Sequence, residues 1–276
     1  METTTNIAHR GARSIAPENT IAAAGKALVS GADLWETDVA VSKDGELFLF
    51  HDDSLVRTTD AKEKFPGRRP WVYTDFLWRE IQTLDAGSVF VDRDPFGQIK
   101  EGAVSTEDLQ SYRGEKIPSL EQALLFTEEN DFKINLEIKY LSRSFQDFPI
   151  AAEVIKLINR LKIDPLSIII SSFNHYWLKQ VETMMPEIEV QALIGYSKMG
   201  PLNWGKFEFP VYNARSTLID SKQITTAKEK GKKINLFTIN KVEDMKRFID
   251  AGIDGLITDF PQRLASINKR NSKKSP

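Results

Sequence analysis

The sequence of 276 residues contains no cysteine. Disulfide bonds, thiolate-bound metals and cysteine nucleophiles are therefore excluded, and nothing in the composition points to an oxidising compartment. The sequence also lacks a run of about 18 apolar residues, the length that a membrane-spanning helix needs. Its first residues, METTTNIAHRGA, have neither the basic nor the apolar region of a secretory signal. We therefore expect a soluble, cytoplasmic protein with no transmembrane segment.

The chain has little excess charge of either sign. Its 37 basic and 39 acidic residues give a formal net charge of −2, so no overall field attracts a polyanion. We therefore expect no nucleic-acid partner, and an anionic small molecule must be bound by a few local groups. Hydrophobic residues make up 41% of the chain, which is enough to bury a large core.

Short apolar runs, rich in β-forming residues, alternate with helical patterns along most of the chain. This alternation is typical of parallel strands joined by helices. Eight such runs match the eight strands of a closed barrel. We therefore predict an α/β fold, a (β/α)8 TIM barrel formed by residues 1–276 as a single domain. The predicted strands are Asn6 to His9, Leu34 to Val41, Phe132 to Ile138, Leu166 to Ser171, Glu187 to Ile194, Pro210 to Asn213, Lys233 to Asn240 and Gly255 to Thr258.

Seven helices are predicted between these strands, and several have recognisable ends. Ser119 precedes Gln122 near a first turn, while Gly31, Gly231 and Gly252 follow last turns, where a left-handed residue is favoured. The predicted helices are Glu18 to Ser30, Ser119 to Glu129, Pro149 to Leu161, His175 to Met184, Ser221 to Lys230, Val242 to Asp250 and Gln262 to Asn268.

Residues 52–116 interrupt this rhythm after the second strand region. They hold the Pro/Gly-rich and charged stretches DAKEKFPGRRP and DRDPFGQIKEG around a shorter apolar piece, TDFLWREIQTLDAG. Loops of this length are usually functional, and in a barrel they lie over the catalytic mouth. We predict a small insertion that caps the site, because Trp71, Phe76 and Trp78 favour local packing over disorder. Residues 269–276 are expected to form a flexible tail.

Three carboxylates are candidates for a metal site. Glu36 and Asp38 lie two apart in LWETDVAV, so they point to the same face of a strand whose apolar neighbours predict burial. Two buried like charges are costly unless a cation joins them. Glu137, at the end of the strand NLEIK, can complete an all-oxygen site for one divalent cation, Ca²⁺ or Mg²⁺, with Mn²⁺ as a third option. The alternative is a solvated strand edge with salt bridges.

Two of the three histidines end apolar runs on either side of the strand with the paired carboxylates. His9 begins HRGARSIAPENT and His51 begins HDDSLVRTT, so both are expected at the catalytic mouth. Two imidazoles can act as acid and base in a displacement at phosphorus. We favour His9 as the acid and His51 as the base, with the opposite assignment left open. His175 starts a later helix and is expected to have a structural role.

Basic side chains near the histidines can bind a phosphate group. The planar guanidinium of Arg10 can hold two phosphoryl oxygens at once, and Lys139 adds a second positive charge. Arg10 can also pair with Glu18, which we expect to be part of the same site.

Several motifs occur in a fixed succession: HRGA, PENT, WETDV, SKDG, HDDSLVRTT, LDAGSVF, LEIK, LFTIN and AGIDGLITDFPQRL. This succession resembles the glycerophosphodiester phosphodiesterase family over nearly the whole chain. The resemblance implies a metal-dependent enzyme of the phospholipase C-like barrel type. Such an enzyme hydrolyses small glycerophosphodiesters, such as glycerophosphocholine, glycerophosphoethanolamine or glycerophosphoinositol, to glycerol 3-phosphate and an alcohol.

The resemblance also implies roles for individual residues. One position departs from the family pattern: Phe237 stands where the family's C-terminal W-T-V-N segment has tryptophan, which retains an aromatic wall but removes an indole N–H. The resemblance implies catalytic roles for His9 and His51, metal ligation by Glu36, Asp38 and Glu137, and substrate or phosphate binding by Arg10, Glu18, Asn19, Lys139, Phe237 and Asn240.

Three alternative functions share parts of this pattern. A lysophospholipase D or a phosphatidylinositol-specific phospholipase C would use the same barrel with a lipid substrate, and an exposed apolar rim would favour it. A non-catalytic phosphate-binding barrel would lack a histidine or an acid, and none is missing here. A zinc hydrolase of the amidohydrolase kind would have H-x-H in its first strand, where this chain has H-R-G. The sequence does not predict an oligomeric state.

Overall fold

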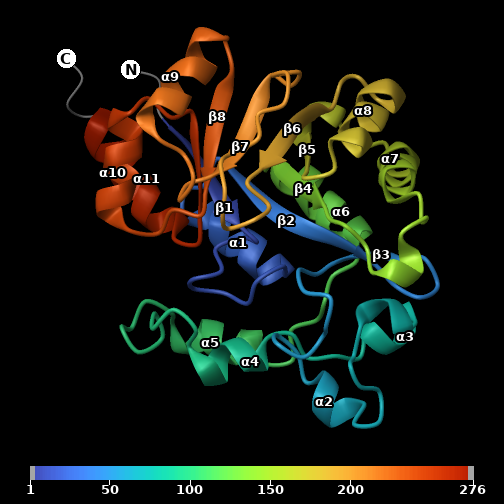
Figure 1. Cartoon of the computed structure of the whole chain (residues 1–276). Coiled ribbons are helices and arrows are strands. Elements are labelled where there is room, and N and C mark those ends of the chain that lie inside the picture. Colours follow the sequence, from blue (N-terminus) through green and yellow to red (C-terminus); the bar gives the residue numbers. More distant parts are fainter. Residues whose placement is uncertain (1–3, 273–276) are drawn as a thin grey trace.

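The computed structural model describes residues 4–272, except the side chains of Arg143 and of residues 270–272. Eight parallel strands form its centre (Figure 1). Their order is β1, β9, β8, β7, β6, β5, β4 and β2, and β1 also pairs with β2, so the sheet closes on itself. The predicted (β/α)8 barrel is confirmed. Its parallel strands are β1 (Thr5–His9), β2 (Leu34–Val41), β4 (Ile134–Ile138), β5 (Ile168–Ser172), β6 (Glu189–Ile194), β7 (Val211–Arg215), β8 (Lys233–Phe237) and β9 (Gly255–Thr258).

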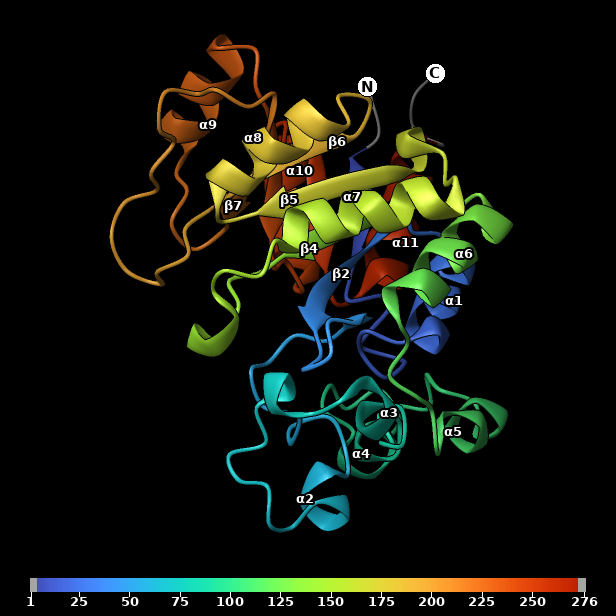
Figure 2. The same cartoon turned by 90° about the vertical axis from the view of Figure 1, so that its right-hand side faces the viewer.

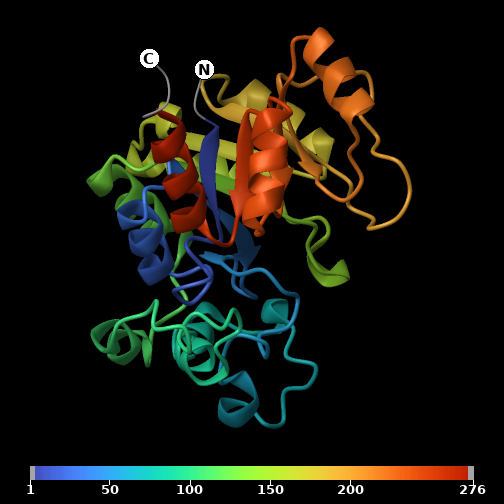
Figure 3. The same ribbon diagram turned by 90° about the vertical axis from the view of Figure 1, so that its left-hand side faces the viewer.

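Helices surround this barrel, and each of the seven predicted helices is present (Figures 1 and 3). The predicted end signals are also present: the Ser119 side chain accepts a hydrogen bond from the Gln122 amide, and Gly31, Gly231 and Gly252 have positive φ. The helices are α1 (Ile21–Val29), α6 (Leu120–Asn130), α7 (Ile150–Leu161), α8 (His175–Met184), α9 (Ser221–Glu229), α10 (Val242–Asp250) and α11 (Pro261–Ser272), with short 3₁₀ helices η2 (Arg143–Phe145) and η3 (Pro165–Ser167).

The C-terminal helix enters the predicted tail. α11 continues to Ser272, so residues 269–272 of the tail are helical, and the remaining residues, 273–276, lie outside the described part. Within residues 4–272, no helix combines the length and the apolar character needed to cross a membrane.

The core lies between the barrel and its helices because each element has one apolar face. α7 illustrates this, since its apolar residues recur every three to four positions and therefore lie on one side of the helix. Burying one such isoleucine side chain stabilises the fold by roughly 1.5–3 kcal/mol relative to leaving it in water. The side chains that α7 buries are Ile150, Ala151, Val154, Ile155 and Ile158.

Residues 52–116 form a separate layer beyond the carboxyl end of β2 (Figure 2). The short strand β3 (Leu47–Leu49) pairs antiparallel with β2 and leads into this layer. The helices of the layer are short, and its apolar side chains form a hydrophobic cluster with Ala40 of β2 and Phe48 of β3. The elements of the layer are α2 (Ala61–Lys64), η1 (Tyr73–Asp75), α3 (Trp78–Ile81), α4 (Ser88–Arg93) and α5 (Thr106–Tyr112).

The aromatic residues of this layer pack inward. Trp71, Tyr73 and Phe76 are buried, and the rings of Phe48 and Trp78 lie 5.7 Å apart. These side chains therefore do not form the exposed apolar rim that would favour a lipid substrate. They stabilise the layer against the end of the barrel instead.

Candidate active site at the carboxyl ends of the strands

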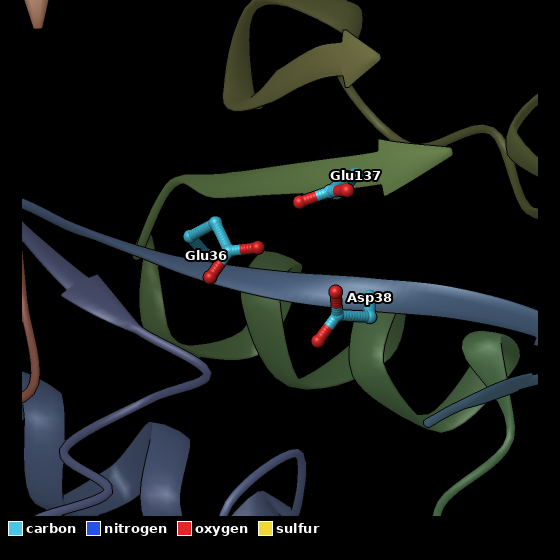
Figure 4. A group of neighbouring side chains, drawn as sticks. All are labelled: Glu36, Asp38 and Glu137. Carbon is cyan, nitrogen blue, oxygen red and sulfur yellow. The ribbon is translucent and has the colours of Figure 1, made fainter. Parts of the chain in front are cut away.

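Three carboxylates from two neighbouring strands meet at one point. Glu36 and Asp38 lie on β2, and Glu137 lies on β4, where it is paired in register with Asp38. One carboxylate oxygen of each residue lies within 4.8 Å of the others. Figure 4 shows the three side chains turned toward one another. The alternation of side chains along β2 produces this arrangement, because residues two apart share a face.

Burial makes this cluster electrostatically costly. Burial raises the pKa of Glu36 well above its usual range, and the charges of Asp38 and Glu137 raise it further. Burial and the charge of Asp38 also raise the pKa of Glu137 to about 7. Burial alone would raise the pKa of Asp38 as well, but the positive charges of Lys139, His51 and Arg10 hold it below its usual range. The cluster therefore favours a bound positive charge.

Of the three carboxylates, Asp38 makes the most contacts with other side chains of the protein. Its Oδ1 lies 3.4 Å from Lys139 Nζ, and its Oδ2 lies 3.3 Å from Arg10 Nε and accepts a 3.0 Å hydrogen bond from Asn19 Nδ2. Glu36 accepts one hydrogen bond, 3.0 Å long, from the Arg10 amide. Within the described residues, Glu137 accepts none. The carboxylate oxygens that remain fit a hard divalent cation, which prefers oxygen ligands.

His9 lies beside this cluster because β1 pairs with β2, which places His9 opposite Glu36. Its Nδ1 lies 2.6 Å from Asp259 Oδ1, and a carboxylate can only accept, so Nδ1 carries the proton and Nε2 is left as an acceptor. Burial lowers the pKa of His9 to about 4, with a further lowering by Arg10 that Asp259 opposes. His9 is therefore a neutral imidazole at pH 7.

His51 lies two residues after β3, which pairs with the end of β2. The preceding residue, Phe50, donates its amide hydrogen to the Asp38 carbonyl oxygen over 3.0 Å. The Nδ1 atom of His51 lies 2.5 Å from Asp52 Oδ1. Asp52 is also bonded to Arg57, whose NH2 group donates a 2.6 Å hydrogen bond to Glu18 Oε1. Both histidines thus have a carboxylate at Nδ1.

A tight turn after β1 positions the basic side chains. Arg10 and Asn19 both have positive φ, and the Asn19 amide donates a 3.1 Å hydrogen bond to the Arg10 carbonyl oxygen. A Cβ atom on Gly11 would lie 2.6 Å from the backbone carbon of Ala23, so only glycine fits there. Arg10 NH1 donates a 2.8 Å hydrogen bond to Glu18 Oε1. Glu18 therefore orients the guanidinium, as its proximity in the sequence suggested.

The other residues singled out from the sequence lie at different distances from the carboxylates. Phe237, the last residue of β8, has its ring 6.1 Å from that of Phe173. Asn240 donates a 2.6 Å hydrogen bond to Asp259 Oδ2, so it orients the partner of His9. His175 lies elsewhere: its Nε2 is 3.0 Å from the Leu193 carbonyl oxygen, in agreement with its expected structural role.

Comparison with known proteins identifies the family. A profile of the glycerophosphoryl diester phosphodiesterase family matches residues 9–263. The chain belongs to this family. The phosphodiesterase is 34% identical over 267 residues to the glycerophosphodiester phosphodiesterase of Caldanaerobacter subterraneus, a match that covers 96% of this chain and 97% of that protein. It is 31% identical over 272 residues to the enzyme of the same name from Bacillus altitudinis, with coverages of 95% and 97%.

A solved structure agrees with this assignment. The phosphodiesterase superposes with a TM-score of 0.75 on a phosphodiesterase from Oleispira antarctica in complex with its product, sn-glycerol-3-phosphate. The two chains are 26% identical, and the match covers 96% of each. The chain is thus a phosphoric diester hydrolase, and the expected family and enzyme class are confirmed.

Four residues of this phosphodiesterase site were not assigned from the sequence. Asp52 and Arg57 lie in the motif HDDSLVRTT beside His51, so their position was an available signal. Asp259 follows β9 directly and therefore lies at the catalytic end of the barrel. Arg13 lies 2.9 Å from Asp259, and its role follows only from that contact.

Proposed function

We propose that this phosphodiesterase hydrolyses small glycerophosphodiesters, such as those of choline, ethanolamine or inositol, to sn-glycerol 3-phosphate and an alcohol. The single observation that carries this proposal is the convergence of Glu36, Asp38 and Glu137. His9 is paired in register with Glu36, and the residue before His51 is hydrogen-bonded to the Asp38 backbone. The sn-glycerol-3-phosphate bound to the related Oleispira antarctica enzyme supports the choice of product.

We expect Glu36, Asp38 and Glu137 to hold one divalent cation, Ca²⁺ or Mg²⁺. Such an ion, when bound, neutralises charge on the diester and on the attacking oxygen. Arg10 and Lys139 flank Asp38, so both lie where a phosphate group bound at this site would meet them. Their positive charges are expected to stabilise the negative charge that develops on the phosphoryl oxygens.

The two histidines are expected to move the protons of the reaction. The Nε2 of neutral His9 accepts a proton from a water molecule as the water oxygen bonds to phosphorus. The bond from phosphorus to the alcohol oxygen breaks, and His51 donates a proton to that oxygen, so that sn-glycerol 3-phosphate and the free alcohol are released. This assignment reverses the preference drawn from the sequence, because His9, with its pKa lowered to about 4, is unprotonated at pH 7 and has no extra proton to donate.

The proposal is tested by incubating the purified chain with glycerophosphocholine, glycerophosphoethanolamine and glycerophosphoinositol in the presence of Ca²⁺ or Mg²⁺. We expect release of sn-glycerol 3-phosphate and the free alcohol. His9→Ala and His51→Ala should each lower kcat by about 10²- to 10⁴-fold, because each removes one proton transfer. His175→Ala is the matched control, since His175 contacts the Leu193 carbonyl oxygen and not the site.

Two results would contradict the proposal. Release of a phosphorylated alcohol and free glycerol would mean that the other ester bond is cut. A kcat near that of the unmodified chain in either histidine variant would remove that histidine from the mechanism, provided that the circular dichroism spectrum shows a folded barrel.

A further inference from the structure

Five aromatic side chains form a continuous group at the mouth of the barrel, which we call the aromatic rim. Four of them follow or end parallel strands, so they lie at the same end of the barrel as the three carboxylates. Tyr140 directly follows Lys139, whose ammonium lies 3.4 Å from Asp38. The rim therefore begins one residue along the chain from a side chain expected to bind the phosphate. It consists of Tyr140 after β4, Phe173 after β5, Trp177 on α8, Tyr196 after β6 and Phe237 at the end of β8.

Three ring pairs of the rim are nearly perpendicular, whereas the Tyr140 and Trp177 rings, 5.7 Å apart, are tilted at 45°. The Phe173 and Phe237 rings are 6.1 Å apart at 83°, and the Phe173 and Tyr196 rings are 5.1 Å apart at 78°. The Tyr140 and Tyr196 rings are 6.0 Å apart at 82°. In such edge-to-face pairs the edge of one ring contacts the face of its neighbour, which leaves the other ring faces for further contacts. Aromatic ring faces are the groups that bind quaternary ammonium ions.

Folding alone does not account for the exposed part of the rim. Tyr140 is 52% exposed and Tyr196 is 69% exposed. Residues 195–210, which include Tyr196, connect β6 to β7 without a helix. Buried aromatic residues stabilise a core, but exposed aromatic faces beside an active site are available to a ligand.

A cation already lies on one ring of the rim. The guanidinium carbon of Arg215 lies 5.1 Å from the centre of the Phe237 ring, and Arg215 is held there by a 2.5 Å hydrogen bond from its Nε to the Gly195 carbonyl oxygen. Ring faces attract cations because their quadrupole is negative above and below the ring. The rings of Phe173, Tyr140 and Tyr196 remain for a ligand cation, since no residue of the described chain makes a cation–π contact with them.

We propose that the aromatic rim binds a quaternary ammonium group on the leaving alcohol, so that a choline ester of glycerol phosphate is the preferred substrate. This inference rests on the proposed function, because it places the leaving alcohol beside Lys139. In choline two carbons separate the ammonium group from the ester oxygen. The ammonium group therefore stays close to the phosphate, within reach only of side chains that border the phosphate position. A polyol such as inositol would instead need several hydrogen-bonding side chains where the rim presents ring faces.

The test compares kcat/KM for three diesters: glycerophosphocholine, its uncharged 3,3-dimethylbutyl counterpart and glycerophosphoinositol. The dimethylbutyl ester has the shape of choline without its charge, so it separates cation–π binding from apolar contact. We expect the choline ester to be preferred over this counterpart by about 2- to 30-fold. Tyr196→Ala should abolish the preference through a higher KM for the choline ester alone, while Tyr196→Phe should retain it.

Tyr176→Ala is the control, because Tyr176 is 68% exposed on α8 but lies outside the rim. Equal kcat/KM for the choline and dimethylbutyl esters, or a preference for the inositol ester, would overturn the inference while leaving the hydrolase proposal intact. Failure to hydrolyse any of the three would instead refute the proposed function. In that case calorimetric titration with tetramethylammonium still decides about the rim, which should bind it in the unmodified chain and not in Tyr196→Ala.

Discussion

Asp259 and Asp52 each accept a hydrogen bond from the Nδ1 atom of a histidine at the site. This contact selects the tautomer in which Nε2 faces away from the carboxylate, so it determines which nitrogen can exchange a proton with a substrate. Asp259 is held in turn by Arg13 and by the Asn240 amide. The two histidines thus depend on residues that need not touch a substrate themselves.

Asp259→Asn is expected to lower kcat by about 10- to 100-fold with little change in KM, because the histidine loses its orienting charge while the phosphate-binding groups remain. Steady-state kinetics with a glycerophosphodiester measures both constants. Asp254→Asn serves as the control, since Asp254 bonds Lys228 at the opposite ends of the strands. A kcat within about twofold of the unmodified value would exclude a role of Asp259 in orienting His9.

Glu36→Gln is expected to separate metal binding from stability. In the metal-free protein the variant should be at least as stable as the unmodified chain, because burial and the neighbouring acids already oppose ionisation of Glu36 and an amide avoids that cost. Its affinity for Ca²⁺ or Mg²⁺ should fall at least about 10-fold. Calorimetric titration and thermal unfolding measure the two effects. An unchanged cation affinity would show that Glu36 is not a ligand.

At the residue scale, the sequence predicted the clustered carboxylates but not the carboxylates that bond the two histidines. Glu36 and Asp38 were accessible because strand alternation places residues two apart on one face. The pairing of His9 with Asp259 joins residues 250 positions apart, and no local pattern encodes such a contact. Asp52 lies next to His51, but adjacency alone does not predict a hydrogen bond.

At the scale of elements, all eight predicted parallel strands and all seven predicted helices are present. The clearest difference is the start of α1, which was expected at Glu18 and begins at Ile21. Thr20 caps this helix by accepting a hydrogen bond from the Ala23 amide, and Asn19 has a left-handed backbone. The residues before Thr20 therefore belong to the turn of the active site. β3 was not predicted, because three residues are too few to show a period.

The short helices of residues 52–116 were also not predicted one by one, and α2 and α3 have only four residues each. Such helices are not stable alone, so side-chain contacts between loops determine them. Asp85 provides several of these contacts. Its carboxylate accepts hydrogen bonds from the amides of Gly87, Ser88 and Gly114 and from the Ser88 hydroxyl, at 2.6 to 3.2 Å.

Asp85→Asn should lower the free energy of unfolding by about 1–3 kcal/mol at pH 7, because the new amide group faces N–H donors. Burial would raise the pKa of Asp85, but these hydrogen bonds lower it below its usual value. The carboxylate therefore stabilises the fold above the ordinary pKa of aspartate, and this contribution is lost as the pH falls through the lower native pKa. Urea unfolding at pH 7 and at pH 3 measures the difference, which should shrink at the lower pH. An equal difference in the free energy of unfolding at the two pH values would contradict this account of Asp85.

At the scale of the whole molecule, closure of the barrel assembles the site from both ends of the chain. β1 pairs with both β2 and β9, which brings His9 between Glu36 and the residue that follows β9, Asp259. The count of eight apolar runs was enough to predict this closure. The layer of residues 52–116 lies beyond the carboxyl end of β2 (Figure 2), and Lys26 of α1 forms an ion pair with Asp108 of this layer over 2.7 Å. We propose that this layer caps the site.

The central claim is that Glu36, Asp38 and Glu137 bind one cation on which hydrolysis depends. The most direct test is to remove divalent cations with a chelator, to confirm that the barrel remains folded, and to add Ca²⁺ or Mg²⁺ back in known amounts. Release of sn-glycerol 3-phosphate should stop after chelation and return in proportion to the cation bound, reaching its maximum at about one ion per chain. Undiminished hydrolysis by the metal-free protein would contradict the claim.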